Sequence, residues 1–365
     1  MAIGGGSRAM WKELALRMLA GVENLTHRGQ SPVVFVPRLN LGVGGPRTFM
    51  ALLVEGLRKR GMRVTSNRMV RADAAIIPIS APPGMIREWK SRGTLIVQRL
   101  DGLFYDASNG VYNAHRNHDA AVLYKELADV VVFQSRYSQS QCSWFMGEPG
   151  TVWQTVILNG TDPARFSPGD RQCPSVNTGG WKMVSTGNFR DASMVVPVVQ
   201  ALDQLWLERQ DFRWTMIGPV SFSGHAAWMS RPYLAHMADA SRAEIAAALK
   251  GSDLFVYAFL NPNCPNSVIE AGAAALPVVG FGSGAMQELC GYNSELLASM
   301  PDRVIHVESD LDPQKLLACI RLCLAEYTVF RARAMAQREA FGIDRAVDAY
   351  AETIQNRLLS RPLLS

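Results

Sequence analysis

Short apolar runs alternate with longer segments of helical periodicity along almost the whole chain. The first apolar run, Val33 to Val36, precedes a glycine-containing loop and the segment FMALLVEGLRKRG, which has apolar residues at helical spacing and a basic last turn. Alternation of buried strands with helices is typical of a doubly wound α/β domain. The pattern predicts further strands at 74–79, 94–98, 130–134 and 155–158.

A break in this pattern divides the chain into two halves. Residues 166–180, FSPGDRQCPSVNTGG, are rich in Pro, Gly and Ser and predict a linker. The second half predicts strands at 181–185, 214–217, 254–257, 277–280 and 303–306 and a helical tail at about 330–358. We therefore expect an N-terminal domain at 1–165, a second domain at 181–330 and a C-terminal helical segment at 331–365. A chain of 365 residues allows each domain its own core.

Composition and charge narrow the class of protein. Hydrophobic residues make up 48% of the chain, which is typical of a packed globule. The net charge of +5 suits an anionic nucleotide or a membrane surface, but no basic run or nucleic-acid-reading motif occurs, so we expect no nucleic-acid partner.

Cysteine usage and the N-terminus bear on location. The six cysteines form no CxxC pair, no apolar run approaches the ~18 residues of a membrane span, and the N-terminus lacks a signal-peptide pattern. These features predict a reducing, cytoplasmic location. Residues 10–25 form an amphipathic pattern that suits packing on the protein, with peripheral contact at the inner membrane face as the alternative.

One segment of the second half carries specific chemistry. In CPNSVIEAGAAALPVVGFGSGAMQEL, Pro265 and Asn266 predict a turn, and Ser267 is an expected N-cap for a short helix carrying Glu270. A buried strand and the loop Gly282, Ser283 and Gly284 follow. Backbone N–H groups of such a loop can face an anion. A carboxylate beside a glycine loop at a strand end suits a ribose and a diphosphate.

This segment resembles the donor-site signature of glycosyltransferases with the GT-B fold, specifically the large retaining family 4. The segments ADVVVFQSRYSQSQ and ILNGTDPARFSP are similar to family 4 patterns near the end of the N-terminal domain. The resemblance implies an α/β protein with GT-B architecture, in which two Rossmann-like doubly wound domains face an interdomain cleft. It also implies an N-terminal acceptor domain, a C-terminal nucleotide-sugar domain, and a last helix that packs back on the N-terminal domain.

Two further segments supply candidate residues. The stretch STGNFRDASMVV occupies the place of the family 4 phosphate-binding element, with Arg190 as its cation. Asp101 follows a predicted strand at the sheet edge where ligands bind, and contact with acceptor or donor sugar competes there with loop capping. The resemblance gives Arg190 and Asp101 as catalytic residues and, as donor-binding residues, Gly44, Gly45, Asn266, Ser267, Glu270, Gly282, Ser283 and Gly284.

The chain departs from the family pattern at two points. Pro262 stands where family 4 proteins often carry a second glutamate, eight positions before Glu270. The usual phosphate-site lysine is also missing beside Arg190, where the sequence reads Ala192, Ser193 and Met194. Asn261, Asn263 or Asn266 are then the expected amide contacts to the sugar.

The expected reaction moves a sugar from a nucleotide-diphosphate donor, with retention, to a carbohydrate, lipid-linked or small-molecule hydroxyl. No cofactor and no metal are expected, since the only close histidines and carboxylate, His115, His118 and Asp119, do not have HExxH spacing. A nucleotide-sugar epimerase or hydrolase, and a non-catalytic nucleotide-sugar-binding protein, remain alternatives.

Overall fold

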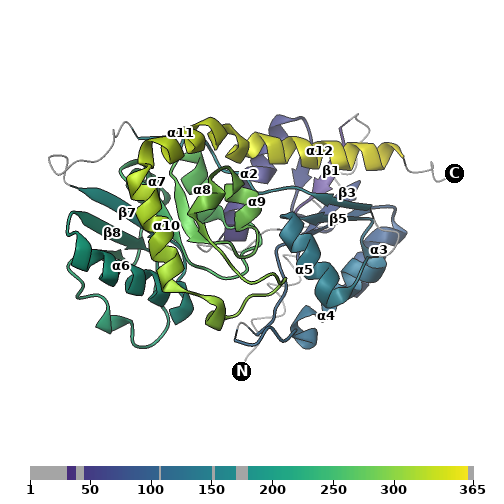
Figure 1. Cartoon of the computed structure of the whole chain (residues 1–365). Helices are drawn as coiled ribbons and strands as arrows, with labels where there is room; N and C mark the ends of the chain where they lie inside the picture. Colours follow the sequence, from purple (N-terminus) through teal and green to yellow (C-terminus); the bar gives the residue numbers. More distant parts are fainter. Residues whose placement is uncertain (1–30, 38–44, 107, 150–152, 170–179, 361–365) are drawn as a thin grey trace, which may run out of the picture.

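The computed structural model describes residues 31–37, 45–106, 108–149, 153–169 and 180–360. In this part of the chain, the strands form two six-stranded parallel sheets with helices on their faces (Figure 1). The predicted fold class, two doubly wound α/β units, is confirmed.

The first sheet has the strand order β2-β1-β3-β4-β5-β6, and every pairing is parallel. Its strands are β1 (Val33–Phe35), β2 (Arg63–Thr65), β3 (Ala74–Pro78), β4 (Leu95–Leu100), β5 (Val130–Phe133) and β6 (Trp153–Val156). The strand order reverses between β1 and β3, which are neighbours in the sheet although β2 lies between them in the sequence.

The second sheet has the order β12-β11-β10-β7-β8-β9 and is also parallel. Its strands are β7 (Trp181–Thr186), β8 (Phe212–Ile217), β9 (Leu234–Met237), β10 (Leu254–Tyr257), β11 (Val278–Phe281) and β12 (Leu297–Ala298). The order reverses between β7 and β10. Open parallel sheets bind ligands beyond the carboxyl ends of the strands at such reversal points.

Helices cover both faces of each sheet because buried strand residues alternate between the faces. In the first sheet, Val34 packs in one core with α2 and α12, whereas Val33 and Phe35 pack in the opposite core with α3. The helices are α2 (Gly45–Lys59), α3 (Pro83–Ser91), α4 (Ala114–Val122), α5 (Arg136–Met146), α6 (Val196–Glu208), α7 (Arg242–Lys250), α8 (Asn266–Ala273), α9 (Met286–Cys290), α10 (Pro313–Ala325), α11 (Tyr327–Gln337) and α12 (Ile343–Leu359).

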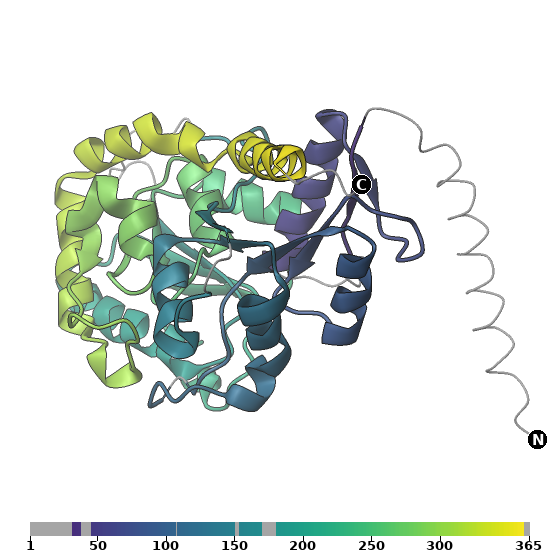
Figure 2. The same cartoon turned by 90° about the vertical axis from the view of Figure 1, so that its right-hand side faces the viewer.

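The C-terminal helix connects the two halves. The chain passes from α11, beside the second sheet, into α12, which lies against α2 of the first (Figures 1 and 2). Val347 and Tyr350 of α12 are buried in the core that contains Phe49 of α2. Arg60, directly after α2, pairs with Asp344 and Asp348.

Three local predictions were wrong. Residues 303–306 are not a strand, because the backbone of His306 bonds to the Asn261 side chain instead of a neighbouring strand. The strands β2, β9 and β12 were not predicted, and all three end a sheet. β2 and β9 are only partly buried and so lack a strong apolar pattern, whereas β12 is buried but has only two residues. Helix α8 is capped by Pro265, so Ser267 lies within its first turn rather than at the N-cap.

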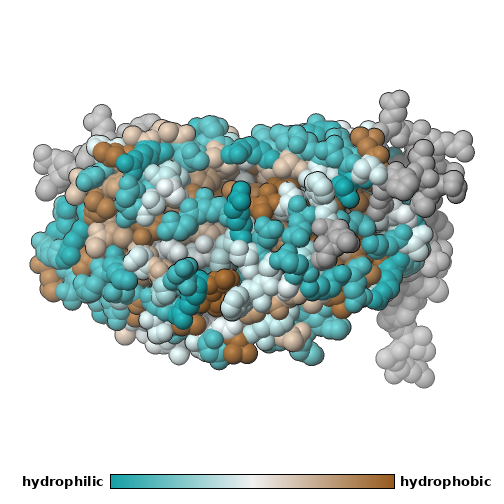
Figure 3. All heavy atoms as spheres, turned by 45° about the vertical axis from the view of Figure 1, so that its right-hand side comes forward, coloured by the Kyte–Doolittle hydropathy of each residue, from teal (hydrophilic) through white to brown (hydrophobic). Residues whose placement is uncertain are grey.

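The surface is mainly hydrophilic on the face seen in Figure 3, where hydrophobic residues form small, separated groups. Among the described helices, none has both the length and the apolar character needed to cross a membrane. Five of the cysteines lie within the described residues, and all five are buried free thiols.

Candidate functional site

The carboxyl ends of the two sheets meet at a cavity of about 240 Å³. From the first half, residues after β4, β5 and β6 line it; from the second, the segment that follows β10 does. Its lining contains a cation, a carboxylate and several amides: Arg99, Asp101, Gln134, Asn159, Asn261, Asn263 and Asn266. A cavity with convergent polar groups between two domains is a typical position for a ligand site.

Asn159 connects the two halves at the base of this cavity. Its side-chain amide donates to the Asn266 Oδ1, at 2.9 Å, and to the backbone oxygen of Cys264, at 3.0 Å. Its side-chain oxygen accepts a bond from Arg99, at 2.9 Å. Because Arg99 belongs to β4 and Asn266 begins α8, this one amide fixes the position of a strand in one half relative to a helix in the other.

A buried ion pair forms one wall of the cavity. Arg99 and Asp101 are bonded to each other, and their side chains are only 1% and 5% exposed. The guanidinium of Arg99 also lies over the Phe49 ring, 4.5 Å from its centroid. Because Arg99 is enclosed in this way, its charge is stabilised by Asp101 and by the hydrogen bond to Asn159 rather than by water.

Two buried oxygen atoms on this cavity have no hydrogen-bond partner among the described residues. They are Oδ2 of Asp101 and Oδ1 of Asn263. The two segments approach closely, because a Cβ on Gly102, whose φ is +126°, would collide with the Asn263 amide. Buried acceptors without partners are costly, so hydroxyl donors of a ligand would stabilise them.

The loop after β10 is held in an unusual conformation. Asn261 has φ +51°, in the left-handed region, and its backbone N–H donates to the Ser283 Oγ at 2.9 Å. The Asn261 amide forms two bonds with the backbone of His306, whose Nδ1 lies 3.0 Å from the Ser283 Oγ. Strained backbone that several contacts hold in place is common at functional sites.

The predicted glycine loop is largely engaged with the protein itself. The Gly282 N–H donates to the Ala298 oxygen at 2.9 Å, and the Ser283 hydroxyl is fully buried in the Asn261–His306 network. Gly284 has φ +60°, and a Cβ there would meet the backbone of Pro262. In this structure the Ser283 side chain therefore orders the loop after β10.

Glu270 lies on α8 and is nearly buried, with a side chain 5% exposed. One of its oxygens accepts a bond from Arg242 at 2.7 Å, and Arg242 lies over the ring of Phe166. Burial raises the pKa of Glu270, although Arg242 and then Arg165 act in the opposite direction. The carboxylate thus has a protein cation beside it, which sequence analysis did not identify.

Arg190 is exposed in the segment that follows β7. The segment is firmly held, because Phe189 is buried and exchanges backbone bonds with Pro219 and Ser221. The Arg190 side chain forms no hydrogen bond or ion pair with the described residues. Arg190 lies beyond the carboxyl end of β7, where the strand order reverses, and this position suits a side-chain cation that contacts an anionic ligand. Lys182, in contrast, lies near the start of the same strand.

Four other predicted residues are placed as follows. Gly44 lies outside the described residues, and Gly45 begins α2. Asn266 and Ser267 form the first turn of α8. Of the predicted set, Asp101 and Asn266 line the same cavity, whereas Glu270, Arg190 and the glycine loop do not line it.

Glu288 joins the two halves at a second point. Its carboxylate accepts the backbone N–H of Arg136 at 2.7 Å and also interacts with the N–H of Tyr137, at the start of α5 in the first half. Burial raises the pKa of Glu288, while these donors lower it. The carboxylate therefore adds to the Ser135 cap of α5.

We expect Glu288→Ala to lower the free energy of unfolding by about 1 kcal/mol, because two N–H groups lose a charged acceptor. Urea denaturation measures the change. Glu295→Ala is the control, since Glu295 forms an exposed pair with Arg333 and its loss should cost less. Equal effects of the two substitutions would contradict a capping role for Glu288.

Three residues of the candidate site are not among the predicted site residues. Asn159 and Arg99 both line the cavity. The sequence does contain a feature that marks Arg99. An arginine within the largely apolar strand LIVQRL is unusual and implies a buried partner. Arg242, the partner of Glu270, lies 28 positions earlier in the chain and had no local signal.

No family model matches the chain, and no curated protein matches it. Solved structures do. The sucrose-phosphate synthase of Thermosynechococcus elongatus is 12% identical with a TM-score of 0.71, over 91% of this chain and 100% of that one. Anabaena Alr3699/HepE, in complex with UDP and glucose, is 12% identical with a TM-score of 0.67, over 90% and 100%. A Rickettsia africae glycosyltransferase is 15% identical with a TM-score of 0.64, over 92% and 100%.

At sequence identities of 12% to 15%, the similarity to these three structures shows the fold of the chain. The similarity extends over nine-tenths of this chain and the whole of each of the three structures, so it includes both sheets. The chain has the GT-B fold, with two Rossmann-like halves.

Proposed function

We propose that this protein is a glycosyltransferase that moves a sugar from a nucleotide-diphosphate donor to an acceptor hydroxyl with retention. The observation that carries the proposal is the cavity between the two sheets, where the acceptors Asp101 Oδ2 and Asn263 Oδ1 are buried without a partner in the described part of the chain. Sugar hydroxyls supply the donors that such oxygens require. Complexes of HepE with UDP and with UDP-glucose, on the same fold, support a nucleotide-sugar donor.

The two halves have different roles in this proposal. Residues 1–165 bind the acceptor, residues 181–330 bind the donor, 166–180 link them, and the segment 331–365 returns to the first half through α12. Glu270 accepts hydrogen bonds from the ribose, and Arg242 keeps its carboxylate charged. The N-terminus of α8, at Asn266 and Ser267, and the 282–284 loop border the diphosphate.

Asn263 contacts the donor sugar in place of the second glutamate that family 4 proteins often carry. Pro262 occupies that position and has no hydrogen-bonding side chain, whereas the Asn263 amide lines the cavity directly beside it. An amide binds a sugar hydroxyl without adding negative charge near the diphosphate.

The reaction itself needs no protein nucleophile. The bond between the sugar C1 and the diphosphate oxygen breaks, the acceptor oxygen bonds to C1 on the same face, and the acceptor proton passes to the leaving phosphate. Arg190 stabilises the negative charge that grows on that phosphate, and Asp101 orients the acceptor hydroxyl. Catalysis comes from positioning and charge stabilisation in a closed site.

Donor binding tests the proposal. We expect UDP-, GDP-, ADP- or TDP-sugars to raise the melting temperature, since a ligand that binds only the native state stabilises it. Glu270→Gln should weaken that shift while the protein still folds, because a neutral amide accepts ribose hydrogen bonds less strongly. Release of free nucleoside diphosphate on addition of acceptors measures turnover. A protein that neither binds nor turns over any of these sugars would contradict the proposal.

Metal removal gives a second test. We expect EDTA to leave the transfer rate unchanged, because the proposed charge stabilisation comes from Arg190 and backbone groups rather than from a metal ion. The measurement compares initial rates before and after dialysis against EDTA. Full loss of activity followed by rescue with Mn²⁺ would contradict this mechanism.

A protein that binds a nucleotide sugar without transferring it is the second candidate. The replacement of the usual glutamate by Pro262, and of the usual lysine near Arg190, favours it. A thermal shift with a donor and no product with any acceptor class would support this candidate over the transferase.

A further inference from the structure

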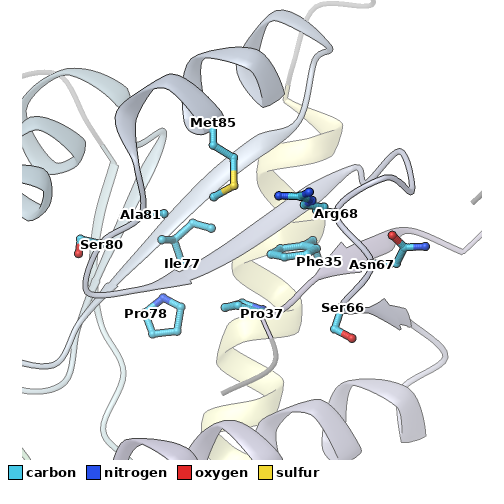
Figure 4. A pocket seen from close by; sticks show the side chains of 10 residues that line it. All are labelled: Phe35, Pro37, Ser66, Asn67, Arg68, Ile77, Pro78, Ser80, Ala81 and Met85. Carbon is cyan, nitrogen blue, oxygen red and sulfur yellow. The ribbon is translucent and has the colours of Figure 1, made fainter. Parts of the chain in front are cut away.

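A second and larger cavity, of about 420 Å³, lies in the first half (Figure 4). It opens where strand order reverses in the first sheet, because Phe35 ends β1 and Ile77 and Pro78 end β3. This reversal point is where an open parallel sheet binds ligands. None of the residues proposed above to bind the donor lines it.

The lining of this cavity has two chemically different sides. Phe35, Ile77 and Met85 provide an apolar surface, which Pro37, Pro78 and Ala81 extend. Ser66, Asn67 and Arg68, from the segment after β2, lie together at one side (Figure 4). Small-molecule sites combine such an apolar surface with a few polar groups that fix orientation.

One wall is built from a strained turn. Ile79 has φ +62°, which is rare for a β-branched residue, and the Ser80 N–H donates to the Pro78 oxygen at 2.8 Å. The strain is held by β4, since the Ile79 N–H donates to the Arg99 oxygen and the Gln98 amide donates to the Ile79 oxygen. Such strain persists where the surrounding structure supports it, and it occurs mainly at functional sites.

The same turn connects this cavity with the proposed reaction site. Pro78 is paired with Arg99 in the sheet, and neighbouring strands are about 4.8 Å apart. Arg99 in turn holds Asp101. A ligand in the larger cavity therefore lies beside the carboxyl end of β3, next to the strand that leads into Asp101, while the Arg99 side chain lies on the opposite face of the sheet, over Phe49.

We propose that the larger cavity binds an apolar acceptor, a hydroxylated aromatic or short aliphatic compound rather than a free sugar. Transfer of a sugar to this compound rests on the proposed transferase function, whereas binding of the compound in the cavity does not. The apolar body contacts Phe35, Ile77 and Met85, and the acceptor hydroxyl points along β4 toward Asp101. A free monosaccharide has too many hydroxyl groups for this surface, and burying them there would leave them unpaired.

Calorimetric titration of the full chain without a donor tests the inference. The probe is 4-methylumbelliferone, a compact aromatic phenol, and methyl β-D-glucopyranoside is the polar comparison. We expect one site for the phenol and at least tenfold weaker binding of the glucoside. Ala81→Trp, which fills the cavity, and Met85→Gln, which places an amide on its apolar side, should each weaken phenol binding by at least tenfold.

Met69→Gln is the matched control, because Met69 is a half-buried methionine packed on the same core but does not line the cavity. Met85→Gln keeps the test valid if Ala81→Trp does not fold. No phenol binding, equal binding of the glucoside, or equal effects of Met85→Gln and Met69→Gln would each overturn the inference. UDP titration of the unmodified chain separates this inference from the proposed function: absence of phenol binding with UDP binding intact refutes only the acceptor class.

Discussion

Replacing Asp101 with alanine is expected to lower the free energy of unfolding by about 3–5 kcal/mol. The reason is that the substitution leaves the buried Arg99 without its carboxylate partner. Arg99 is 1% exposed, and Asp101 is the carboxylate that neutralises it. Removal of one member of a buried ion pair leaves an uncompensated charge in the protein interior, and Asn159 supplies only a neutral oxygen.

Urea denaturation with an unchanged m-value measures this loss. Glu88→Ala is the matched control, because it breaks the exposed pair with Arg92 and should cost less than about 1 kcal/mol. The double variant Arg99→Met and Asp101→Ala should recover most of the stability, since it removes both charges. A loss below about 1 kcal/mol for Asp101→Ala would show that the Arg99 charge is solvated in some other way.

Asp101→Asn separates the two roles assigned to this residue. The amide keeps the size of the side chain and one oxygen acceptor, so the variant should retain more stability than Asp101→Ala. Transfer should still fall, because a neutral amide orients an acceptor hydroxyl less strongly than a carboxylate does. The stability and activity of the two variants therefore need not change in parallel.

The pattern of apolar residues was sufficient for the central strands but not for the sheet edges. β4 and β5 are buried along their whole length, and each appears in the sequence as an apolar run. β2 and β9 each lie at the end of a sheet and are partly exposed, so periodicity could not identify them. The segment at 303–306 contains only two apolar residues, Val304 and Ile305, and the side chains of Asn261 and Ser283 bind His306 and hold this segment as a loop.

The sequence identified single residues of the candidate site but not how they combine. Asp101 could be placed at a strand end, but its partner Arg99 is also bonded to Asn159, 60 positions later in the chain. Ser283 could be assigned to a glycine loop, but its contact with His306 depends on how two loops pack. Spacing reveals contacts within one turn or one strand, whereas these contacts follow from tertiary structure.

Arg190→Ala is expected to reduce turnover by about 10²–10³-fold, the usual effect of removing one preorganised charge contact. Charge accumulates on the diphosphate as the bond to the sugar breaks, so the transition state should lose more stabilisation than the bound donor. The rate constant should therefore fall more than donor affinity does. Because Arg190 is exposed, the substitution should leave the free energy of unfolding within about 0.5 kcal/mol of wild type.

Steady-state rates and donor titrations on the same variants measure the two effects. Arg190→Lys should restore only part of the rate, because an ammonium cannot bind two phosphate oxygens in the planar geometry of a guanidinium. Lys182→Ala is the matched control: Lys182 is an exposed cation near the start of β7, at the opposite end of the strand from Arg190. If Lys182→Ala proved the more damaging substitution, the phosphate site would not lie at the carboxyl end of β7, and the proposed positions of the diphosphate and the ribose beside Glu270 would both be wrong.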